Sequence, residues 1–331
     1  MEIQLSIRPQ HFVQAGVQGS VYWYLSRNSE AVAHYAPYIL LQLGFAFVID
    51  ILISALRYKS IRIGFSVFPI VLSINLFLWF KPSYFYLQLL TITLAITLKH
   101  VWTWTWDGKR SHIFNPSGIA LAVASVIALI MGARQSMLLE SIIDAYQASR
   151  PDVFLFVLAV GLISQSLGRV IFVSAGTLMT LFSLSVLSIG LTGMPLMNHP
   201  WIDPSVFVGI TLLVTDPSTT PKRWPAQLVA GGLYAVALLG FYGLLSALQE
   251  PGYFAKVLAV PLVNLTAPYF DRWNWCSTLG ARLRILGQPL IQATLYASFF
   301  LLFLPKMKEG IKSPSWLGQL GGAEWAQTMR R

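Results

Sequence analysis

Two motifs of one type, Asx-Pro-Ser, carry the side chains best suited to bind or position a ligand. They are Asn115-Pro116-Ser117 and Asp216-Pro217-Ser218, and Thr219 follows the second. An Asn or Asp side chain accepts hydrogen bonds from the free N–H groups at a helix start, and Pro suits the first helical position because the N–H it lacks has no partner there. Two helix starts that meet would direct their positive dipole ends into one cavity. The motifs are therefore consistent with two N-caps and with a shared binding site.

Three further polar residues lie in apolar runs: Asp50, Asn75 and Asn264. Polar groups inside a membrane are costly and often line ion or cofactor pathways. Asp50 precedes Arg57 by about two helical turns, and we expect an ion pair between them in preference to a pathway. Asn264 suits a hydrogen bond between helices as well as a contact with a cofactor.

Several kinds of chemistry find no support in the residues. The single cysteine, Cys276, provides neither a disulfide nor a thiolate cluster for iron–sulfur binding. No Ser/His/Asp set, metal-ligand spacing or Walker-type loop stands out, so we expect no hydrolysis, metal centre or ATP-driven activity. The formal charge is +10, but no basic stripe interleaved with aromatic residues marks a nucleic-acid surface.

The composition indicates that lipid surrounds these residues. Of the 331 residues, 55% are hydrophobic and only 11% are charged, and the mean hydropathy of +0.62 exceeds that of ordinary soluble domains. Backbone groups in hydrocarbon need internal partners, and the apolar runs lack the alternation of an outer-membrane barrel. We therefore expect an all-α, polytopic membrane protein.

Apolar runs that could cross about 30 Å of hydrocarbon divide the chain into roughly ten spans. We expect residues 1–35 to lie outside the membrane, residues 36–304 to form the transmembrane domain and residues 305–331 to form a polar tail. The seventh run is short, which suggests a tilted or re-entrant helix. The predicted spans are Ala36–Leu56, Ile61–Phe80, Ser83–Leu98, Pro116–Met131, Val153–Leu167, Val170–Ile189, Pro204–Val214, Ala226–Ala247, Phe254–Phe270 and Ile285–Leu304.

Lys and Arg are concentrated in alternate connections between the spans, which sets the expected orientation. The basic connections should face the cytoplasm, and the amino terminus should then lie outside. The basic connections contain Arg57, Lys59, Arg62, Lys99, Lys109, Arg110, Arg169, Lys222, Arg223, Arg272, Arg282 and Arg284, whereas the opposite ones contain Lys81, Arg134, Arg150 and Lys256.

Three segments resemble, in order and spacing, motifs of the NqrB/RnfD family, the flavin-carrying membrane subunits of the sodium-pumping NADH:quinone reductase and of Rnf complexes. They are Phe114-Asn115-Pro116, Leu212–Thr220 and Leu262–Asp271, and the resemblance covers most of the span from Ala36 to Asp271. Each motif is short, but three in family order within an apolar chain are fairly specific. The chain departs from the family by lacking an apolar run for its first membrane helix and by gaining Ile285–Leu304.

The resemblance implies a non-covalently bound flavin, riboflavin or FMN, in a cavity on the cytoplasmic side. The Asn of the Phe-Asn-Pro motif, Asn115, would lie beside this flavin, and the turn from Asp216 to Thr220 would lie close to the cavity. His112 stands where the family has a second Asn, so this pocket differs in detail. The candidate flavin-binding residues are His112, Phe114, Asn115, Asp216, Thr219 and Asn264.

The family also carries an FMN that is joined through its phosphate to a Thr on the outer side. The corresponding connection here is Ile142–Pro151, with Ser149 in the acceptor position. It lacks the Gly of the family motif and one further residue, and it offers Ser in place of Thr. A covalent FMN at Ser149 and an ordinary polar loop are the two alternatives for this connection.

The expected function is that of a membrane subunit of an electron-transfer complex in the bacterial inner membrane, which binds flavin and works with other membrane and soluble subunits. The chain has no Gly-rich nicotinamide-binding element, so the primary oxidation is expected in a partner and the chain is not expected to be an enzyme alone. Two alternatives use the same scaffold. One is a transporter of a flavin, another vitamin or another solute, and the other is a structural subunit without a cofactor.

Overall fold

The computed structural model describes residues 2–6, 8–28, 30–106, 109–131, 138–139, 151–193 and 204–272. Of the part of the chain that the structure describes, 81% is helical and 6% is strand, which confirms a mostly helical fold. Ser149, the predicted span Ile285–Leu304 and the tail 305–331 lie outside the described residues, as does most of the connection Ile142–Pro151.

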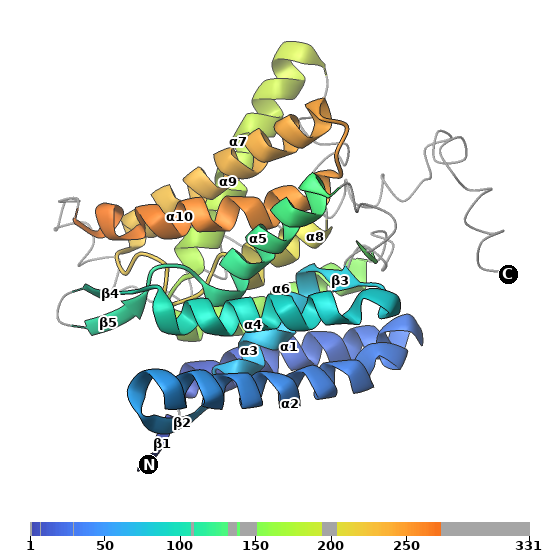
Figure 1. Cartoon of the computed structure of the whole chain (residues 1–331). Coiled ribbons are helices and arrows are strands. Elements are labelled where there is room, and N and C mark those ends of the chain that lie inside the picture. Colours follow the sequence, from blue (N-terminus) through green and yellow to red (C-terminus); the bar gives the residue numbers. More distant parts are fainter. Residues whose placement is uncertain are drawn as a thin grey trace, which may run out of the picture.

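The described residues from Pro9 to Ile130 contain five helices (Figure 1). They are α1 (Pro9–Asn28), α2 (Glu30–Tyr58), α3 (Val67–Phe77), α4 (Phe85–Val101) and α5 (Pro116–Ile130), and the 3-10 turn η1 (Pro82–Tyr84) precedes α4. Short strands join the helix ends: β1 (Glu2–Ser6) pairs in parallel with β2 (Ser60–Gly64), and two antiparallel pairs are β3 (Trp79–Phe80) with β6 (Leu138–Leu139) and β4 (Thr103–Trp106) with β5 (Lys109–His112).

The second half contains longer helices around a broken one. They are α6 (Pro151–Gly168), α7 (Ile171–Thr192), α8 (Pro204–Val208), η2 (Gly209–Leu213), α9 (Trp224–Ala247), η3 (Gly252–Phe254) and α10 (Ala255–Arg272). The helix α7 packs along α9, α9 packs on α10, and α10 contacts α5, so the two halves form one continuous bundle.

Residues 9–28, part of the segment expected outside the membrane, form the helix α1, which packs against α2, α3 and α6 (Figure 1). Because β1 pairs with β2, which follows α2, the start of the chain lies at the end of the bundle that holds the basic connections. This corrects the expected placement of the amino terminus at the opposite end. The reason is that α1 adds one more passage along the bundle before α2 begins.

The predicted span Ile61–Phe80 is not one helix. It begins as β2, forms the short helix α3 and ends in β3. Asn75, fully buried in α3, donates to the Gln42 side chain of α2 and accepts from Gln88 Nε2 of α4 at 3.3 Å. Gln88 Nε2 also donates to the backbone of Leu78, just after the helix, at 3.1 Å. These amides therefore hold the broken end of α3 between its neighbours.

The predicted short seventh span is also broken, because α8 continues as a π-helix, η2. Its wider turn is supported by side chains from neighbouring helices. Ser174 of α7 donates to the carbonyl of Ile210 at 2.8 Å, and Gln165 of α6 donates to the carbonyl of Thr211 at 2.9 Å. The irregular backbone is thus satisfied within the protein, as it must be in an apolar environment.

The helices α7 and α9 approach each other backbone to backbone. A Cβ atom at Gly231 would lie 2.0 Å from the Val173 carbonyl oxygen, and one at Gly176 would lie 2.2 Å from that of Leu228. Thr177 Oγ1 donates across the contact to the Gly231 carbonyl at 3.0 Å. Small residues that allow so close an approach are typical of helix pairs in membranes.

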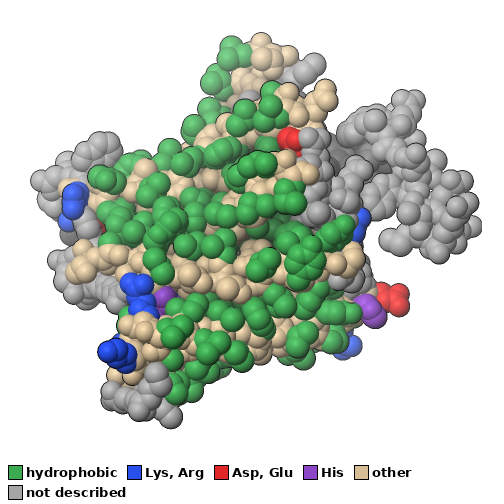
Figure 2. Space-filling view, in the orientation of Figure 1, with side chains coloured by type: hydrophobic (Ala, Val, Ile, Leu, Met, Phe, Trp, Pro, Cys, Tyr) green, Lys and Arg blue, Asp and Glu red, His purple; other side chains and the backbone are tan. Residues whose placement is uncertain are grey.

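Within the described ranges, three helical segments are long and apolar enough to cross a membrane: Val32–Tyr58, Ile171–Thr192 and Trp224–Ala247. Figure 2 shows hydrophobic side chains spread over the visible face of the bundle, while most of the visible Lys and Arg side chains gather at the end where β4 and β5 lie. A band of exposed apolar side chains with charges confined to its ends is compatible with a lipid-facing surface.

Candidate functional site: a polar pocket at the basic end of the bundle

Asn115 is the N-cap of α5, as its motif predicts. Its Oδ1 accepts from the backbone N–H of Ser117 at 3.1 Å and of Gly118 at 3.3 Å, and also from Ser117 Oγ at 2.9 Å. Pro116 occupies the first helical position, where a missing donor has no cost. The side chain is therefore held in one orientation at the start of α5.

All three family-like motifs meet at Asn115. Its Nδ2 donates to the carbonyl of Leu213, the last residue of η2, at 3.0 Å. Its backbone N–H donates to Asn264 Oδ1 of α10 at 2.9 Å. A helix start, the end of a π-helix and a third helix are thus joined by one buried residue, although the motifs that supply them lie far apart in the sequence.

The second Asx-Pro-Ser motif does not cap a helix, which corrects the expectation of two N-caps. Asp216 instead closes a turn: its carboxylate accepts from Ser218 N–H at 3.4 Å, from Ser218 Oγ and from Thr219 Oγ1 at 3.1 Å. The next helix, α9, begins only at Trp224, after an N-cap residue, Arg223, that makes no side-chain cap bond. The Asp216 carboxylate is thus held by local hydroxyl and N–H donors.

The third motif reaches the same turn through its last residue. The Asp271 carboxylate accepts from the backbone N–H of Lys222 at 2.9 Å and 3.0 Å and from that of Arg223 at 3.2 Å. The end of α10 therefore fixes the entry into α9. This contact complements the bond between Asn115 and Asn264, which lies about two turns earlier on α10.

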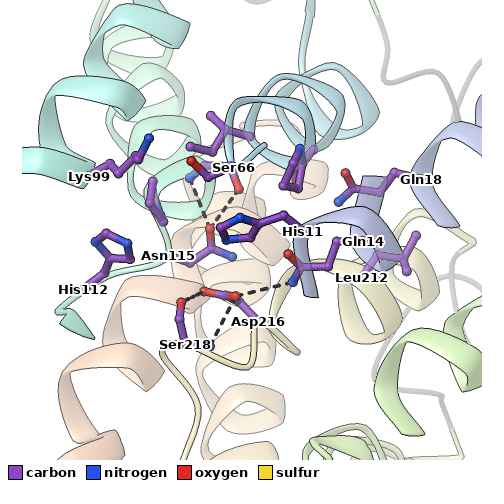
Figure 3. A pocket seen from close by; sticks show the side chains of 15 residues that line it. His11, Gln14, Gln18, Ser66, Lys99, His112, Asn115, Leu212, Asp216 and Ser218 are labelled. Carbon is purple, nitrogen blue, oxygen red and sulfur yellow. Dashed lines mark hydrogen bonds between the residues drawn. The ribbon is translucent and has the colours of Figure 1, made fainter. Parts of the chain in front are cut away.

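A polar pocket lies beside this junction (Figure 3). It encloses about 490 Å³ of empty space, counting its solvent-filled mouth. Apolar parts of its wall come from α3 and η2, namely Pro69, Ile70 and Leu212, together with Pro116 of α5. The polar groups on its wall are His11, Gln14, Gln18, Ser66, Ser73, Lys99, His112, Asn115, Ser117, Asp216 and Ser218.

Two histidines in the pocket are held neutral by their surroundings. Burial, reinforced by the positive charge of Arg8, lowers the pKa of His11 to about 4. Burial also lowers the pKa of His112, against the opposing effect of the Asp216 carboxylate. At neutral pH both imidazoles can therefore offer one N–H and one lone pair, which suits an uncharged polar ligand.

Three buried polar atoms on the pocket wall have no hydrogen-bond partner: His11 Nδ1, His112 Nδ1 and Gln18 Oε1. Gln18 is only 5% exposed. A buried polar atom without a partner typically costs about 1–3 kcal/mol. A ligand that supplies complementary groups would remove that cost, so these atoms point to a binding site.

The sequence-predicted residues divide into two groups. His112, Asn115 and Asp216 line the pocket, whereas Phe114, Thr219 and Asn264 do not. Phe114 packs on the ring of Trp102 with centroids 5.3 Å apart, and Thr219 and Asn264 hold Asp216 and Asn115 in place. Ser149 lies outside the described residues.

Sequence reasoning missed the wall formed by α1. Figure 3 shows His11, Gln14 and Gln18 projecting from α1 toward Asn115 and Asp216, and Gln14 Nε2 approaches Asp216 Oδ1 at 3.5 Å. A signal was present, because His11, Gln14 and Gln18 stand three and four positions apart and so share one helical face. The polar residues before Ala36 argued against a membrane span, and some of them lie on the pocket-facing side of α1.

Asp50 is buried, at 3% exposed, and its partner is not Arg57 as expected. Its Oδ1 accepts from Lys99 Nζ at 2.7 Å and bonds His100 Nε2 at 2.8 Å. Both partners come from the end of α4, because α2 and α4 lie side by side. Lys99 also lines the pocket, so the ion pair stands next to it.

No known family model matches the sequence, and no curated protein matches it closely enough to count as a relative. The likeness to the NqrB/RnfD family therefore rests on the three motifs. Among the described residues, no group of three or more His, Cys, Asp or Glu side chains could hold a metal ion.

Proposed function

We propose that this chain is a polytopic membrane subunit of an electron-transfer complex and that its polar pocket binds a flavin. The observation that carries the proposal is the junction at Asn115. Three motifs that resemble a flavin-carrying family come from distant parts of the chain, and they are bonded to one another beside the pocket. If the three short motifs resembled the family only by chance, there would be no reason to expect hydrogen bonds that join them.

The apolar surface supports the membrane part of the proposal. Three helices of the described part of the chain are long and apolar enough to span a bilayer, and the shorter apolar helices α3, α4, α5 and α6 belong to the same bundle. The pocket opens at the end of the bundle that holds most basic connections, and the bias of Lys and Arg assigns that end to the cytoplasm of a bacterial inner membrane. A flavin there would be accessible to a soluble partner subunit.

The pocket wall offers the kinds of contact that a flavin ring needs. Ile70 and Leu212 offer apolar contact, and the unpartnered atoms of His11, Gln18 and His112 offer hydrogen bonds to the polar edge of the ring. Lys99 would place a positive charge near it. The flavin would supply the electron transfer, while these residues would orient it and set its electrostatic surroundings.

Absorption spectra of the purified protein before and after dithionite test the proposal. We expect a flavin spectrum that dithionite bleaches. The Gln18→Leu variant should retain less flavin, because it removes a pocket hydrogen bond at similar size. The matched control is Gln10→Leu, which makes the same change at an exposed position of the same helix and should leave the flavin content unchanged. A colourless wild-type protein from cells with ample flavin would contradict the proposal and favour a structural subunit without a cofactor.

A second candidate function is transport of a flavin, another vitamin or another solute. The observation that favours it is the broken helix formed by α8 and η2, since transporters often build their binding sites from interrupted helices. The two functions differ in ligand exchange. Radiolabelled riboflavin that enters sealed proteoliposomes down its gradient would support transport, whereas a tightly held flavin that does not cross would support electron transfer.

The covalent FMN at Ser149 is a further part of the proposal. Protein made together with an active flavin transferase should then show flavin fluorescence after denaturing electrophoresis, because only a covalent flavin survives denaturation. The Ser149→Ala variant should be dark. A dark wild-type band, or equal fluorescence in the variant, would leave only the non-covalent site.

A further inference from the structure

Asp50, Lys99 and His100 form a buried charge cluster beside the pocket. One carboxylate oxygen, Asp50 Oδ1, serves both Lys99 Nζ at 2.7 Å and His100 Nε2 at 2.8 Å. Asp50 is 3% exposed and His100 is 7% exposed. Ionisable groups buried in membrane helices are costly and often mark proton or ion pathways, so this cluster needs an explanation beyond packing.

The cluster can exist in two charge states with its hydrogen bonds intact. With a neutral imidazole, the Lys99 ammonium balances the Asp50 carboxylate, and His100 donates its Nε2 proton to that carboxylate. With a second proton on Nδ1 of His100, the cluster gains one positive charge while the bond from Nε2 remains. A proton can therefore bind or leave without breaking the contact between α2 and α4.

Several charges act on this proton from the surrounding elements. Asp50 on α2 favours its binding, whereas Lys99 beside His100 opposes it. Further positive charges lie on α2 and β2: the Arg62 guanidinium stands 4.0 Å from the centre of the Tyr58 ring, which lies 5.7 Å from the ring of His100. Arg57 lies 5.9 Å from the same Tyr58 ring, and the charges of Arg8 and Lys99 both act on the pocket histidines His11 and His112.

The cluster also faces the pocket. The side chain of Lys99 lines the pocket wall while its Nζ bonds Asp50. The charge of Lys99 acts on both pocket histidines, His11 and His112. A negative charge that develops in the pocket would therefore favour protonation of His100, and a proton on His100 would stabilise that negative charge.

We propose that Asp50 and His100 hold one exchangeable proton at the edge of the pocket, with Lys99 linking its charge to the bound group. The proton would bind at and leave from His100 Nδ1, and its charge would act on the pocket through Lys99, which lines the wall. This proposal does not depend on the flavin, because any pocket ligand that changes charge would be coupled to the proton in the same way.

Nuclear magnetic resonance of histidine-labelled protein in lipid nanodiscs tests the proposal. The signal of His100 is identified by its loss in His100→Gln, and exposed His34 near the start of α2 provides an internal reference. We expect the His100 signal to change as the imidazole gains its second proton. In Asp50→Asn its midpoint should fall by at least one unit, a tenfold loss of proton affinity, while the control Asp271→Asn should leave it unchanged.

A second variant keeps the test valid if Asp50→Asn does not fold. Lys99→Gln removes the opposing positive charge, so the midpoint of His100 should rise. A purely structural ion pair, in which His100 keeps one charge state over the accessible pH range, would lose stability in either variant and show no midpoint. A His100 signal that does not titrate, or a midpoint that both variants leave unchanged, would overturn the proposal. The titration requires no flavin, so its failure is separate from failure of the flavin site.

Discussion

Replacing Asn115 measures how firmly the junction beside the pocket is held. Its Oδ1 caps α5, and the loss of an N-cap costs about 0.5–2 kcal/mol. Its Nδ2 satisfies the Leu213 carbonyl, and a buried carbonyl left without a partner costs about 1–3 kcal/mol. Asn115→Ala removes both contributions and should cost about 1.5–5 kcal/mol, an upper bracket because neighbouring contributions are not strictly additive.

Two companion variants separate the parts of this cost. Asn115→Ser keeps an oxygen that can cap α5 but loses the bond to Leu213, so it should cost about 1–3 kcal/mol. Ser117→Ala removes only one hydroxyl bond to Asn115 and should cost about 0.5–1.5 kcal/mol. The expected order of stability is wild type, Ser117→Ala, Asn115→Ser and Asn115→Ala.

The assay is the temperature at which the purified proteins lose their native tryptophan fluorescence in one detergent. The order of these temperatures is the readout, because thermal unfolding of such proteins is often irreversible. Equal losses in Asn115→Ser and Asn115→Ala would refute the capping contribution, and wild-type stability in both would refute the junction. All variants should still insert in the membrane. Loss of flavin from an Asn115→Ser protein that remains folded would indicate that Asn115 contacts the flavin.

Three further predictions follow from the packing, the pocket and the course of α1. Gly231→Ala should destabilise the protein by about 1–3 kcal/mol or more, because the added methyl group would meet a backbone carbonyl. Its control, Gly240→Ala, adds a methyl group in open space on the same helix and should be neutral or stabilising. Thermal unfolding of the two variants measures both effects. The pKa of His11 is lower in the folded state than in the unfolded state, so the unfolded state binds more protons and the free energy of unfolding should fall as the pH drops from about 6.5 toward 4. The His11→Gln variant should show a smaller fall. A pH profile identical to that of the wild type would contradict this prediction. Single cysteines introduced as Gln249→Cys and Leu5→Cys, in a variant that lacks Cys276, test the orientation. An impermeant thiol reagent applied to intact cells should label Gln249→Cys but not Leu5→Cys, because α1 starts at the end assigned to the cytoplasm. Labelling of both would show that the amino terminus is external.

The strongly apolar helices could be predicted from the sequence because their signal is local. The runs that became α2, α7 and α9 are long and apolar. The predicted ends of α7 and α9 lie close to the observed ones, whereas α2 begins at Glu30, well before the predicted Ala36. The breaks in the run from Ile61 to Phe80 and in η2 could not be predicted in the same way. They depend on amide and hydroxyl side chains of other helices, such as Gln88 and Ser174, that satisfy the interrupted backbone.

The candidate site was predictable only where one residue acts locally. Asn115 caps the helix that its own motif begins, so its place followed from neighbouring residues. The bonds from Asn115 to Leu213 and Asn264 depend on tertiary packing, and the partner of Asp50 depends on which helix lies beside α2. The polar face of α1 could be recognised from the spacing of its polar residues, but hydropathy alone does not predict that such a helix packs in the bundle.

The contact between α1 and the turn at Asp216 has a consequence for the order in which the protein is made. Gln14 and Asp216 are separated by 202 positions in the chain. At about 5–20 residues per second, a ribosome adds Asp216 roughly 10–40 s after Gln14. During that interval the part of the pocket wall that contains Asp216 has not been made, and Gln14 lacks the carboxylate that it contacts in the folded protein. Chains that are released before Asp216 is added should therefore contain α1 but lack the turn that it contacts. Cellular quality control can detect such incomplete chains throughout that interval.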